Sequence, residues 1–252
     1  MYSEIEKIKY YLPKKIDLSK QVKKFKLLYK NTGIKYVHKN QSQDVIDLAY
    51  RACKKHRNIN EIDCILFVTQ TPRYLLPSCS CILQDKLNIS KKIYTLDINM
   101  GCSGFVYGLS IAEGLISNKI ASKILLVCAD TYSKYINEKD NNRFIFSDAA
   151  SATLIKKSKI KKINKFHFYT DGSKHKDIII KPNKKKLNEF NMNGTSVYLF
   201  TLINVSNFFK EYIKTSKINL NKIKKIFFHQ ASRIVLEGLR SKLNLKKKVY
   251  FN

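Results

Sequence analysis

The segment Ile93–Phe105, IYTLDINMGCSGF, constrains the fold of this chain most, because it predicts a buried strand that delivers a cysteine to the start of a helix. The first free N–H groups of a helix and its positive dipole end favour a thiolate, so we expect a lowered pKa for Cys102. Gly101 and Gly104 remove side chains on either side of the sulfur, which eases a turn and the approach of a substrate. The segment therefore predicts Cys102 as a nucleophile, although an isolated cysteine is more often a small core residue.

Predicted strands and helices alternate along the chain, which indicates an α/β architecture. Before Lys156 the predicted helices are 44–54, 77–87 and 103–117, and the predicted strands are 63–69, 93–98, 123–129, 144–146 and 151–155. From Lys156 onward the predicted strands are 165–170, 177–181, 224–228 and 247–251, and the predicted helices are 194–215 and 231–243. The second set resembles a repeat of the first, although periodicity alone indicates only the α/β class.

Cysteine spacing and hydropathy narrow the class of protein further. The six cysteines lie in apolar or helical patterns, at positions 53, 64, 79, 81, 102 and 128. Cys79 and Cys81 form a Cys-x-Cys pair, but no second pair follows at zinc-like spacing, so we expect reduced thiols and no metal site. Neither a signal peptide nor an apolar run of about eighteen residues is found, and we expect a cytoplasmic protein without a membrane span.

A histidine stands out late in the chain. His229 follows the apolar segment Ile226–Phe228 and precedes a predicted helix. This is the carboxyl end of a predicted strand, where ligands usually bind in open α/β folds. From its position alone, a helix cap and a functional histidine are equally open interpretations.

Five local patterns occur in order along the chain. They are Leu75–Ser78, Gly101–Gly104, Phe146–Ala152, Met192–Gly194 and Phe228–Ser232. Together they resemble the β-ketoacyl-ACP synthase III family of the thiolase superfamily, and the resemblance extends from about Tyr11 to the C-terminus. It implies a thiolase-like fold of two similar α/β halves in layers, with the nucleophile Cys102 in residues 1–155 and His229 in residues 156–252.

The resemblance also implies a reaction and its partners. An acyl group is transferred to Cys102, and a decarboxylative Claisen condensation with malonyl-ACP then gives a 3-oxoacyl-ACP in fatty acid biosynthesis. The segment His229–Ser232 is similar to the family's His-Gln-Ala-Asn motif, so His229 is implied to stabilise the enolate. No metal or redox cofactor is implied. The implied partners are an acyl carrier protein and a second copy of the chain, in a homodimer formed through residues 75–81 and strand 123–129.

Three departures from the family pattern modify these expectations. Leu27 and Asn31 replace a tryptophan and an arginine that grip coenzyme A, which leaves recognition of coenzyme A open. Leu76 replaces a phenylalanine of the acyl pocket, so the size of the pocket is expected to differ. The chain stops at Asn252, and we expect the second half to lack its final strands and helix, the family's catalytic asparagine loop and a glycine loop, which would impair condensation.

The net charge of +29 ordinarily indicates a nucleic-acid or anionic membrane partner. Only six of the 48 basic residues are arginine, however, and arginine is best suited to bidentate contacts with phosphates and bases. We therefore expect no nucleic-acid partner. The basic clusters at 156–165 and 181–186 are expected to be solvated turns and strand ends, or else a landing surface for an acidic carrier protein.

Two other functions stay open at this point. The first is a thiolase-fold acyltransferase that loads an acyl group on Cys102 and passes it on without condensation. The second is a basic nucleic-acid-binding or carrier-binding protein in which Cys102 is structural. Labelling of Cys102 with iodoacetamide would separate both enzyme interpretations from the binding protein.

Overall fold

The computed structural model describes residues 1–20, 25–40, 42–182, 188–245 and 249–250. The chain forms two compact units whose segments alternate along the sequence. The first unit consists of residues 1–15, 38–133 and 147–166, and the second of residues 16–37, 134–146 and 167–252. The predicted halves 1–155 and 156–252 are a division by internal repeat, and that division stays a prediction.

The first unit is built on a sheet that has five strands in the described part of the chain, in the order β1-β7-β6-β4-β5. The strands are β1 (Tyr2–Tyr11), β4 (Cys64–Val68), β5 (Tyr94–Ile98), β6 (Lys123–Asp130) and β7 (Ala149–Ser158). Strands β5, β4 and β6 are parallel, whereas β7 runs antiparallel to β6 and β1 antiparallel to β7. The predicted strands at 63–69, 93–98, 123–129 and 151–155 are thus confirmed, and β1 was not predicted.

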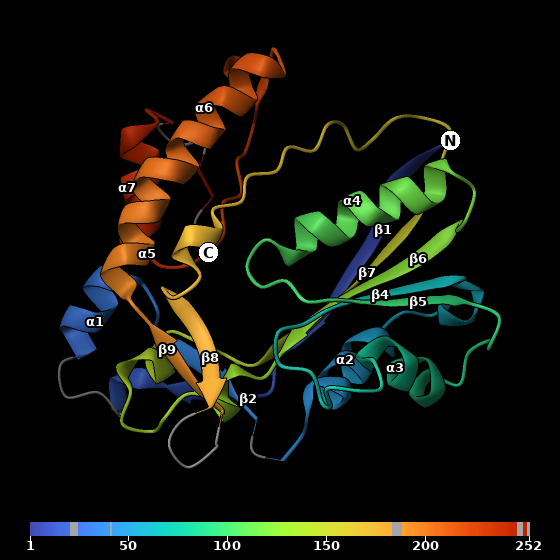
Figure 1. Ribbon diagram of the computed structural model, residues 1–252, viewed down its shortest axis with the longest axis horizontal. Coiled ribbons are helices and arrows are strands. Elements are labelled where there is room, and N and C mark those ends of the chain that lie inside the picture. The colour runs from blue at the N-terminus through green and yellow to red at the C-terminus, as the bar shows by residue number, and fades with distance from the viewer. Residues whose placement is uncertain (21–24, 41, 183–187, 246–248, 251–252) are drawn as a thin grey trace. The chain divides into compact units, whose positions relative to one another are not determined.

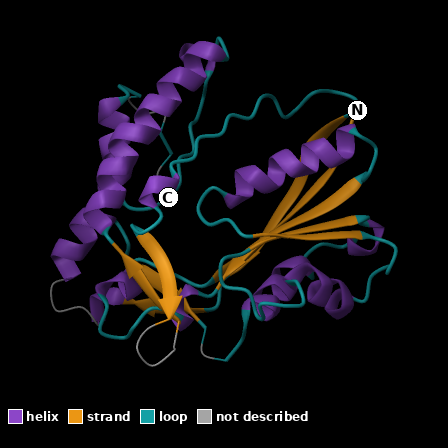
Figure 2. Cartoon of the chain, viewed as in Figure 1, coloured by secondary structure: helices purple, strands orange, loops and turns teal. Residues whose placement is uncertain are grey.

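Helices cover both faces of this sheet (Figures 1 and 2). They are α2 (Val45–Cys53), α3 (Cys79–Leu87) and α4 (Gly104–Ser117). Side chains of β4 alternate between two cores: Ile65 and Phe67 pack with α2 and α3, whereas Leu66 and Val68 pack with α4. Every residue of β4 is buried, which is typical of a parallel strand with helices on both faces.

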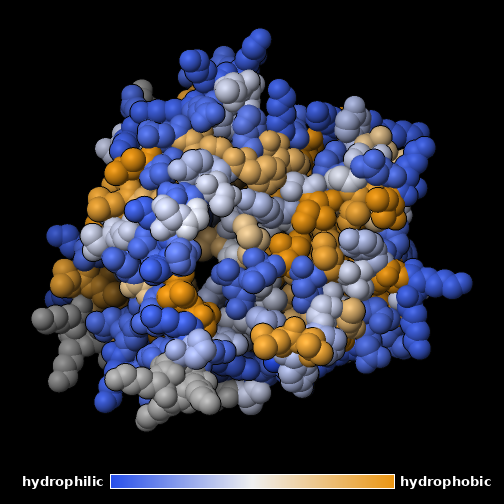
Figure 3. Space-filling model, in the orientation of Figure 1, coloured by the Kyte–Doolittle hydropathy of each residue, from blue (hydrophilic) through white to orange (hydrophobic). Residues whose placement is uncertain are grey.

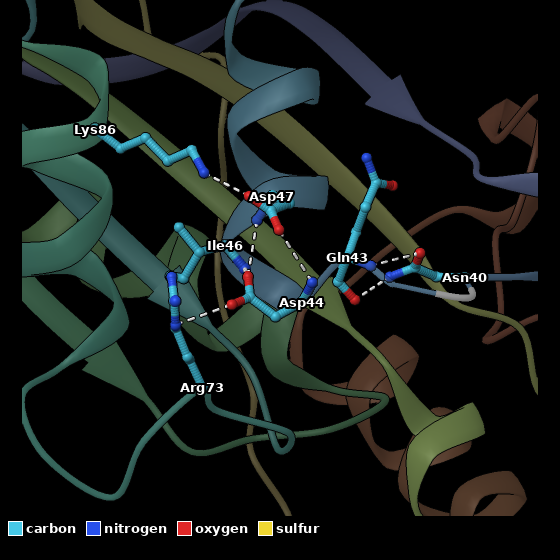
Figure 4. A network of polar contacts seen from close by, with 7 residues as sticks. All are labelled: Asn40, Gln43, Asp44, Ile46, Asp47, Arg73 and Lys86. Atoms are coloured by element: carbon cyan, nitrogen blue, oxygen red, sulfur yellow. Dashed lines mark hydrogen bonds and ion pairs between the residues drawn. The ribbon is translucent and has the colours of Figure 1, made fainter.

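Polar side chains fix the start of α2 (Figure 4). Asp44 is the N-cap, and its side chain accepts hydrogen bonds from the backbone N–H groups of Ile46 and Asp47 at 2.9 and 3.0 Å. The Asp47 side chain in turn accepts a hydrogen bond from the backbone N–H of Asp44, which completes a capping box. Arg73 Nε forms an ion pair with Asp44 Oδ2 at 2.9 Å, and Lys86 of α3 forms an ion pair with Asp47. The network therefore ties α2 to the loop after β4 and to α3.

The second unit has more helix than sheet in its described residues. Its helices are α1 (Phe25–Thr32), α5 (Gly194–Phe200), α6 (Ser206–Thr215) and α7 (Arg233–Lys242), and its hairpin pairs β8 (Ile178–Pro182) with β9 (Asn188–Met192). A π-helical stretch, Thr201–Val205, joins α5 to α6, which confirms the long helix predicted at 194–215. A separate two-stranded sheet pairs β2 (Lys14–Asp17) with β3 (Tyr36–Lys39), and only residues 16–17 and 36–37 of these strands belong to the second unit.

Two of the predicted strands are wrong. Residues 141–144 form a 3-10 turn instead of a strand at 144–146, because the Asp140 side chain accepts a bond from Asn142 N–H at 2.8 Å. Residues 165–170 are not a strand, because their aromatic rings pack on α6. The ring centroids of Tyr169 and Phe208 are 5.9 Å apart.

The end of the second unit matches the predicted pattern in part. The predicted strand 224–228 is reduced to one parallel bridge between Ile226 and Val249. The helix predicted at 231–243 is confirmed as α7. Positions 247, 248 and 251 of the predicted strand 247–251 lie outside the described residues.

Candidate functional site

Cys102 lies in the short turn between β5 and α4. Strand β5 ends at Ile98, Ser103 is the N-cap of α4, and the helix begins at Gly104. The turn is closed by a hydrogen bond of 2.8 Å from Gly104 N–H to the carbonyl oxygen of Gly101. Cys102 is exposed. The structure thus confirms that a strand delivers this cysteine to a helix start, at the carboxyl end of the parallel strands.

The two glycines beside Cys102 are explained by close packing. A Cβ on Gly104 would lie 2.3 Å from Val68 Cγ1, and a Cβ on Gly101 would lie 2.4 Å from Gln70 Oε1. Neither glycine has the positive φ that would favour glycine for its backbone conformation. Both residues therefore let the Cys102 turn lie directly on the end of β4, which was not predicted.

The electrostatic environment of Cys102 contradicts the expected lowering of its pKa. Desolvation is the largest influence and raises the pKa of the thiol, and the Asp130 carboxylate raises it further. A hydrogen bond from the backbone N–H of Cys102 itself lowers the pKa, but not enough to reverse the change. Cys102 is therefore held as a thiol at neutral pH, and it must lose a proton when it reacts.

The other five cysteines, all of them in the described part of the chain, differ from Cys102 in exposure or position. Burial raises the pKa of Cys79 to about 11, and that of Cys64 and Cys128 to about 12. Cys53 is buried, and burial raises its pKa further still. Cys81 is exposed on α3, with Ser78 Oγ at 3.0 Å from its sulfur. That Cys102 is the most reactive thiol stays a prediction.

Asp130, the last residue of β6, organises the chain beside Cys102. Its Oδ1 accepts hydrogen bonds from the backbone N–H groups of Gln70 and Thr71 at 2.8 and 3.0 Å. The same oxygen accepts from the hydroxyls of Thr69 and Thr71 at 3.0 and 2.8 Å. Desolvation nevertheless raises the pKa of Asp130, because these bonds compensate only part of the loss of water.

Sequence reasoning missed this network, although a signal was present. Polar residues directly follow β4 at Thr69–Thr71 and end β6 at Asp130, and the carboxyl ends of neighbouring parallel strands meet at one edge of a sheet. Tyr132 belongs to the same cluster, since its hydroxyl donates to Gln70 Oε1 at 3.0 Å. Desolvation raises the pKa of Tyr132, and the charges of Asp130 and Cys102 raise it as well.

His229 lies in the second unit, in the segment between the Ile226 bridge and α7. It is exposed, and desolvation lowers the pKa of its imidazole from the ordinary value of 6.5, which favours the neutral ring. Ser232 occupies the N-cap position of α7, so His229 is not the helix cap. Cys102 and His229 belong to different units. Their pairing in one site stays a prediction.

Basic residues lie where solvated strand ends and turns were expected. Lys156 is in β7, 3.6 Å from both Glu4 and Glu6, and residues 159–165 form a largely exposed segment. Lys181 is exposed in β8, and positions 183–186 of the second cluster are outside the described residues. The face drawn in Figure 3 is largely hydrophilic, with separate hydrophobic patches.

The described residues offer neither a metal cluster nor a membrane helix. They contain no group of three His, Cys, Asp or Glu side chains arranged to hold a metal ion. Within the same residues, no helix combines the length and the hydropathy that a membrane crossing requires.

The two segments predicted to form a homodimer have very different environments. Strand β6 lies inside the sheet, between β4 and β7, and most of it is buried, so the prediction that residues 123–129 contact a second copy is wrong. The loop before α3 is different. Leu75 and Leu76 are 99% and 82% exposed, and β5 lies at the edge of the sheet beside this region.

Comparisons with known proteins agree on one family. The family model for 3-oxoacyl-[acyl-carrier-protein] synthase III matches residues 96–172, which include Cys102 and Asp130. The β-ketoacyl-[acyl-carrier-protein] synthase III of Clostridium botulinum (strain Kyoto / Type A2) is 32% identical over 239 residues, which cover 88% of this chain and 73% of that protein. A putative 3-oxoacyl-[acyl-carrier-protein] synthase 3 of Campylobacter jejuni is 31% identical over 74% of this chain and 58% of its own length.

Solved structures give the same answer for the fold. A crystal structure of a 3-oxoacyl-(acyl-carrier-protein) synthase III superposes with a TM-score of 0.91 at 29% identity, covering 99% of this chain and 85% of that one. The synthase III of Aquifex aeolicus gives a TM-score of 0.87 at 26% identity, with coverage of 99% and 84%. The thiolase-like fold is thereby confirmed, and the chain belongs to the β-ketoacyl-ACP synthase III family of condensing enzymes.

Proposed function

We propose that this chain catalyses decarboxylative Claisen condensation of an acyl thioester with malonyl-ACP, with Cys102 as the nucleophile. Membership of the synthase III family supports the reaction. The observation that carries the role of Cys102 is its position: an exposed thiol one residue before the N-cap of α4, at the carboxyl end of β5. A condensing enzyme of this family acts in fatty acid biosynthesis.

The first step is acyl transfer to Cys102. The sulfur attacks the carbonyl carbon of an acyl thioester, the bond from that carbon to the donor sulfur breaks, and the donor leaves as a thiol with the proton from Cys102. The backbone N–H of Cys102 helps to hold the oxyanion that forms. Because the pKa of the thiol is raised, removal of its proton is part of this step.

The second step is condensation. The malonyl group loses carbon dioxide when its carbon–carbon bond breaks, and the electron pair left behind forms an enolate. His229 stabilises the enolate by donating a hydrogen bond to the thioester oxygen, which the neutral imidazole favoured by its lowered pKa can do. The enolate carbon attacks the acyl group on Cys102, and the bond from that group to Cys102 Sγ breaks. The 3-oxoacyl-ACP leaves, and the Cys102 thiolate takes a proton from water to become a thiol again.

Cofactors and partners follow from this chemistry. We propose no metal or redox cofactor, because the thioester and the loss of carbon dioxide supply the driving force. The acyl carrier protein is the partner that carries the malonyl group. A second copy of the chain is proposed as a further partner, docked on the exposed Leu75 and Leu76 and on the edge of β5, since exposed apolar side chains and a free sheet edge favour association.

The function is tested with the whole chain, an acyl thioester and malonyl-ACP. Release of carbon dioxide and formation of 3-oxoacyl-ACP are measured for the parent and for Cys102→Ala and His229→Ala, with Cys81→Ala as the matched control for an exposed cysteine. We expect Cys102→Ala to lose condensation, and His229→Ala to keep acyl transfer but to lose decarboxylation by about a hundredfold or more.

Other outcomes have defined meanings. Acyl transfer to Cys102 without any release of carbon dioxide by the parent would favour an acyltransferase that does not condense. Full condensation activity in Cys102→Ala would overturn the proposal.

A further inference from the structure

We propose that Gln70 is a positioning residue for Cys102, because its side-chain amide lies against Gly101 and contacts Tyr132, and its main chain is held by Asp130. The inference rests on the proposed function, since it gives Gln70 a part in acyl transfer to Cys102. Gln70 would act through the turn that carries the nucleophile and would not touch the reacting atoms.

The backbone of Gln70 is fixed at the end of β4. Its N–H donates to Asp130 Oδ1 at 2.8 Å. The same oxygen holds the residues on both sides of Gln70, because it accepts from Thr69 Oγ1 at 3.0 Å and from Thr71 N–H at 3.0 Å. The hydroxyl of Thr71 in turn accepts from Thr131 N–H at 2.8 Å, which binds the end of β6 to this segment. The main chain of Gln70 is therefore held in place on both sides.

The side chain of Gln70 contacts two groups. The space that a Cβ of Gly101 would need is occupied, with Gln70 Oε1 at 2.4 Å and Cδ at 3.2 Å from that position. The same oxygen accepts a hydrogen bond of 3.0 Å from the Tyr132 hydroxyl. The Tyr132 hydroxyl thus holds Gln70 Oε1 next to Gly101, the residue directly before Cys102.

The consequence is a defined position for the nucleophile. The Cys102 turn is supported on one side by Val68 beneath Gly104, and on the other by Gln70 against Gly101. Displacement of a reacting group by about 1 Å can lower a rate by about a hundredfold. Electrostatics agree that Tyr132 lies near the thiol: desolvation is the largest cause of its raised pKa, and negative charge on Asp130 or on ionised Cys102 raises that pKa further.

The contact between Gln70 and Gly101 is tested by a double-mutant cycle. The rate of acyl transfer to Cys102 from an acetyl-N-acetylcysteamine thioester is measured for the parent, Gln70→Ala, Gly101→Ala and the double variant. We expect each single variant to react about tenfold more slowly at unchanged KM. The double variant should recover to within about threefold of the parent, because the methyl group added at position 101 enters the space that Oε1 leaves.

A milder variant keeps the proposal falsifiable if Gly101→Ala does not fold. Tyr132→Phe removes only the hydroxyl that holds Gln70 Oε1, and we expect acyl transfer to slow by about threefold. The matched control is Tyr10→Phe, since Tyr10 is 62% exposed on β1 and should have no effect on the rate. Unchanged rates in both Gln70→Ala and Tyr132→Phe would overturn the proposal, as would strictly additive effects in the cycle.

Failure of the proposed function gives a different result. If the parent itself takes no acyl group on Cys102, the proposed function is wrong. In that case the same four proteins are alkylated with iodoacetamide and Cys102 is followed by peptide mapping. Positioning by Gln70 would still be supported if the alkylation rate of each single variant differs from that of the parent by more than about threefold and the double variant recovers. Equal alkylation rates in all four proteins would overturn it.

Discussion

The regions around Cys102 and His229 are built very differently. Cys102 lies between a buried parallel sheet and α4, with Val68 and Gln70 packed against its two flanking glycines. His229 lies on an exposed segment, preceded by a single bridge at Ile226 and followed by α7. The position of the nucleophile is thus set by the tightly packed core of the first unit, whereas His229 depends on a short segment with less regular structure. We therefore expect an added methyl group near Cys102 to lower the free energy of unfolding more than an added methyl group near His229 does.

The largest effect is expected for Gly104→Ala. Its new Cβ would lie 2.3 Å from Cγ1 of the buried Val68, which has little room to move, so we expect the free energy of unfolding to fall by about 3 kcal/mol. Gly114→Ala is the control in the same helix, because nothing lies within 4 Å of its Cβ, and we expect it to raise stability by about 0.5 kcal/mol. Urea unfolding of both variants is the measurement; equal changes would contradict the packing argument.

The second largest effect is expected on dimerisation of the chain, through the surface of the first unit that carries Leu75 and Leu76. Leu76→Asp places a charge on the exposed surface proposed as the contact, and we expect the dimer to dissociate at concentrations at least about tenfold higher than for the parent. Ile120→Asp is a suitable control, because Ile120 is 61% exposed and lies between α4 and β6. Sedimentation of the three proteins gives the answer. A parent that is monomeric at micromolar concentration would argue against the contact.

A smaller effect is expected in α7, the helix that follows His229. A Cβ on Gly238 would lie 2.8 Å from Leu202 Cδ2, the far end of a flexible side chain, so Leu202 can shift. Gly238→Ala also gains helix propensity, and we expect a free energy of unfolding within about 1 kcal/mol of the parent. Urea unfolding beside Gly104→Ala compares the two regions directly. A loss as large as that of Gly104→Ala would mean that the two regions are equally rigid.

The smallest effect is electrostatic. The Asp130 charge raises the pKa of Cys102, although desolvation raises it more, so Asp130→Asn should move the pH profile of Cys102 alkylation to lower pH. At a fixed pH below that pKa, we expect a rate about threefold higher, because a larger fraction is thiolate. Asp63→Asn is the matched control: Asp63 bonds Ser122 and Lys123 at the opposite end of the same sheet. An unchanged profile in Asp130→Asn would exclude an effect of this charge on the thiol.

The sequence predicted the first unit better than the second, for a physical reason. Strands β4 and β6 are largely apolar segments, and the helix α2 that packs on them has a clear apolar face, so the pattern of the sequence identified them. Residues 165–170 also alternate like a strand, but their rings contact the long helix, as Tyr169 and Phe208 do. Such a choice depends on tertiary contacts that local pattern does not contain.

In the candidate site, likewise, the local features were predicted from the sequence and the long-range contacts were not. Cys102 at a helix start followed from the sequence, because a strand, two glycines and a helix are local features. The raised pKa of Cys102 did not, since desolvation and Asp130 act across the sheet. The contact of Gln70 with Gly101 joins residues 31 positions apart in the sequence, and only the pairing of β4 with β5 places them together.

The role of Cys102 is tested most directly by trapping the acyl group. The parent is incubated with an isotopically labelled acyl thioester, quenched and digested, and the label is mapped among the six cysteines by mass spectrometry. We predict that the label is on Cys102 and that Cys102→Ala carries none, although Cys81 is exposed as well. Label on Cys81 in place of Cys102, or labelling that persists in Cys102→Ala, would contradict the assignment of the nucleophile.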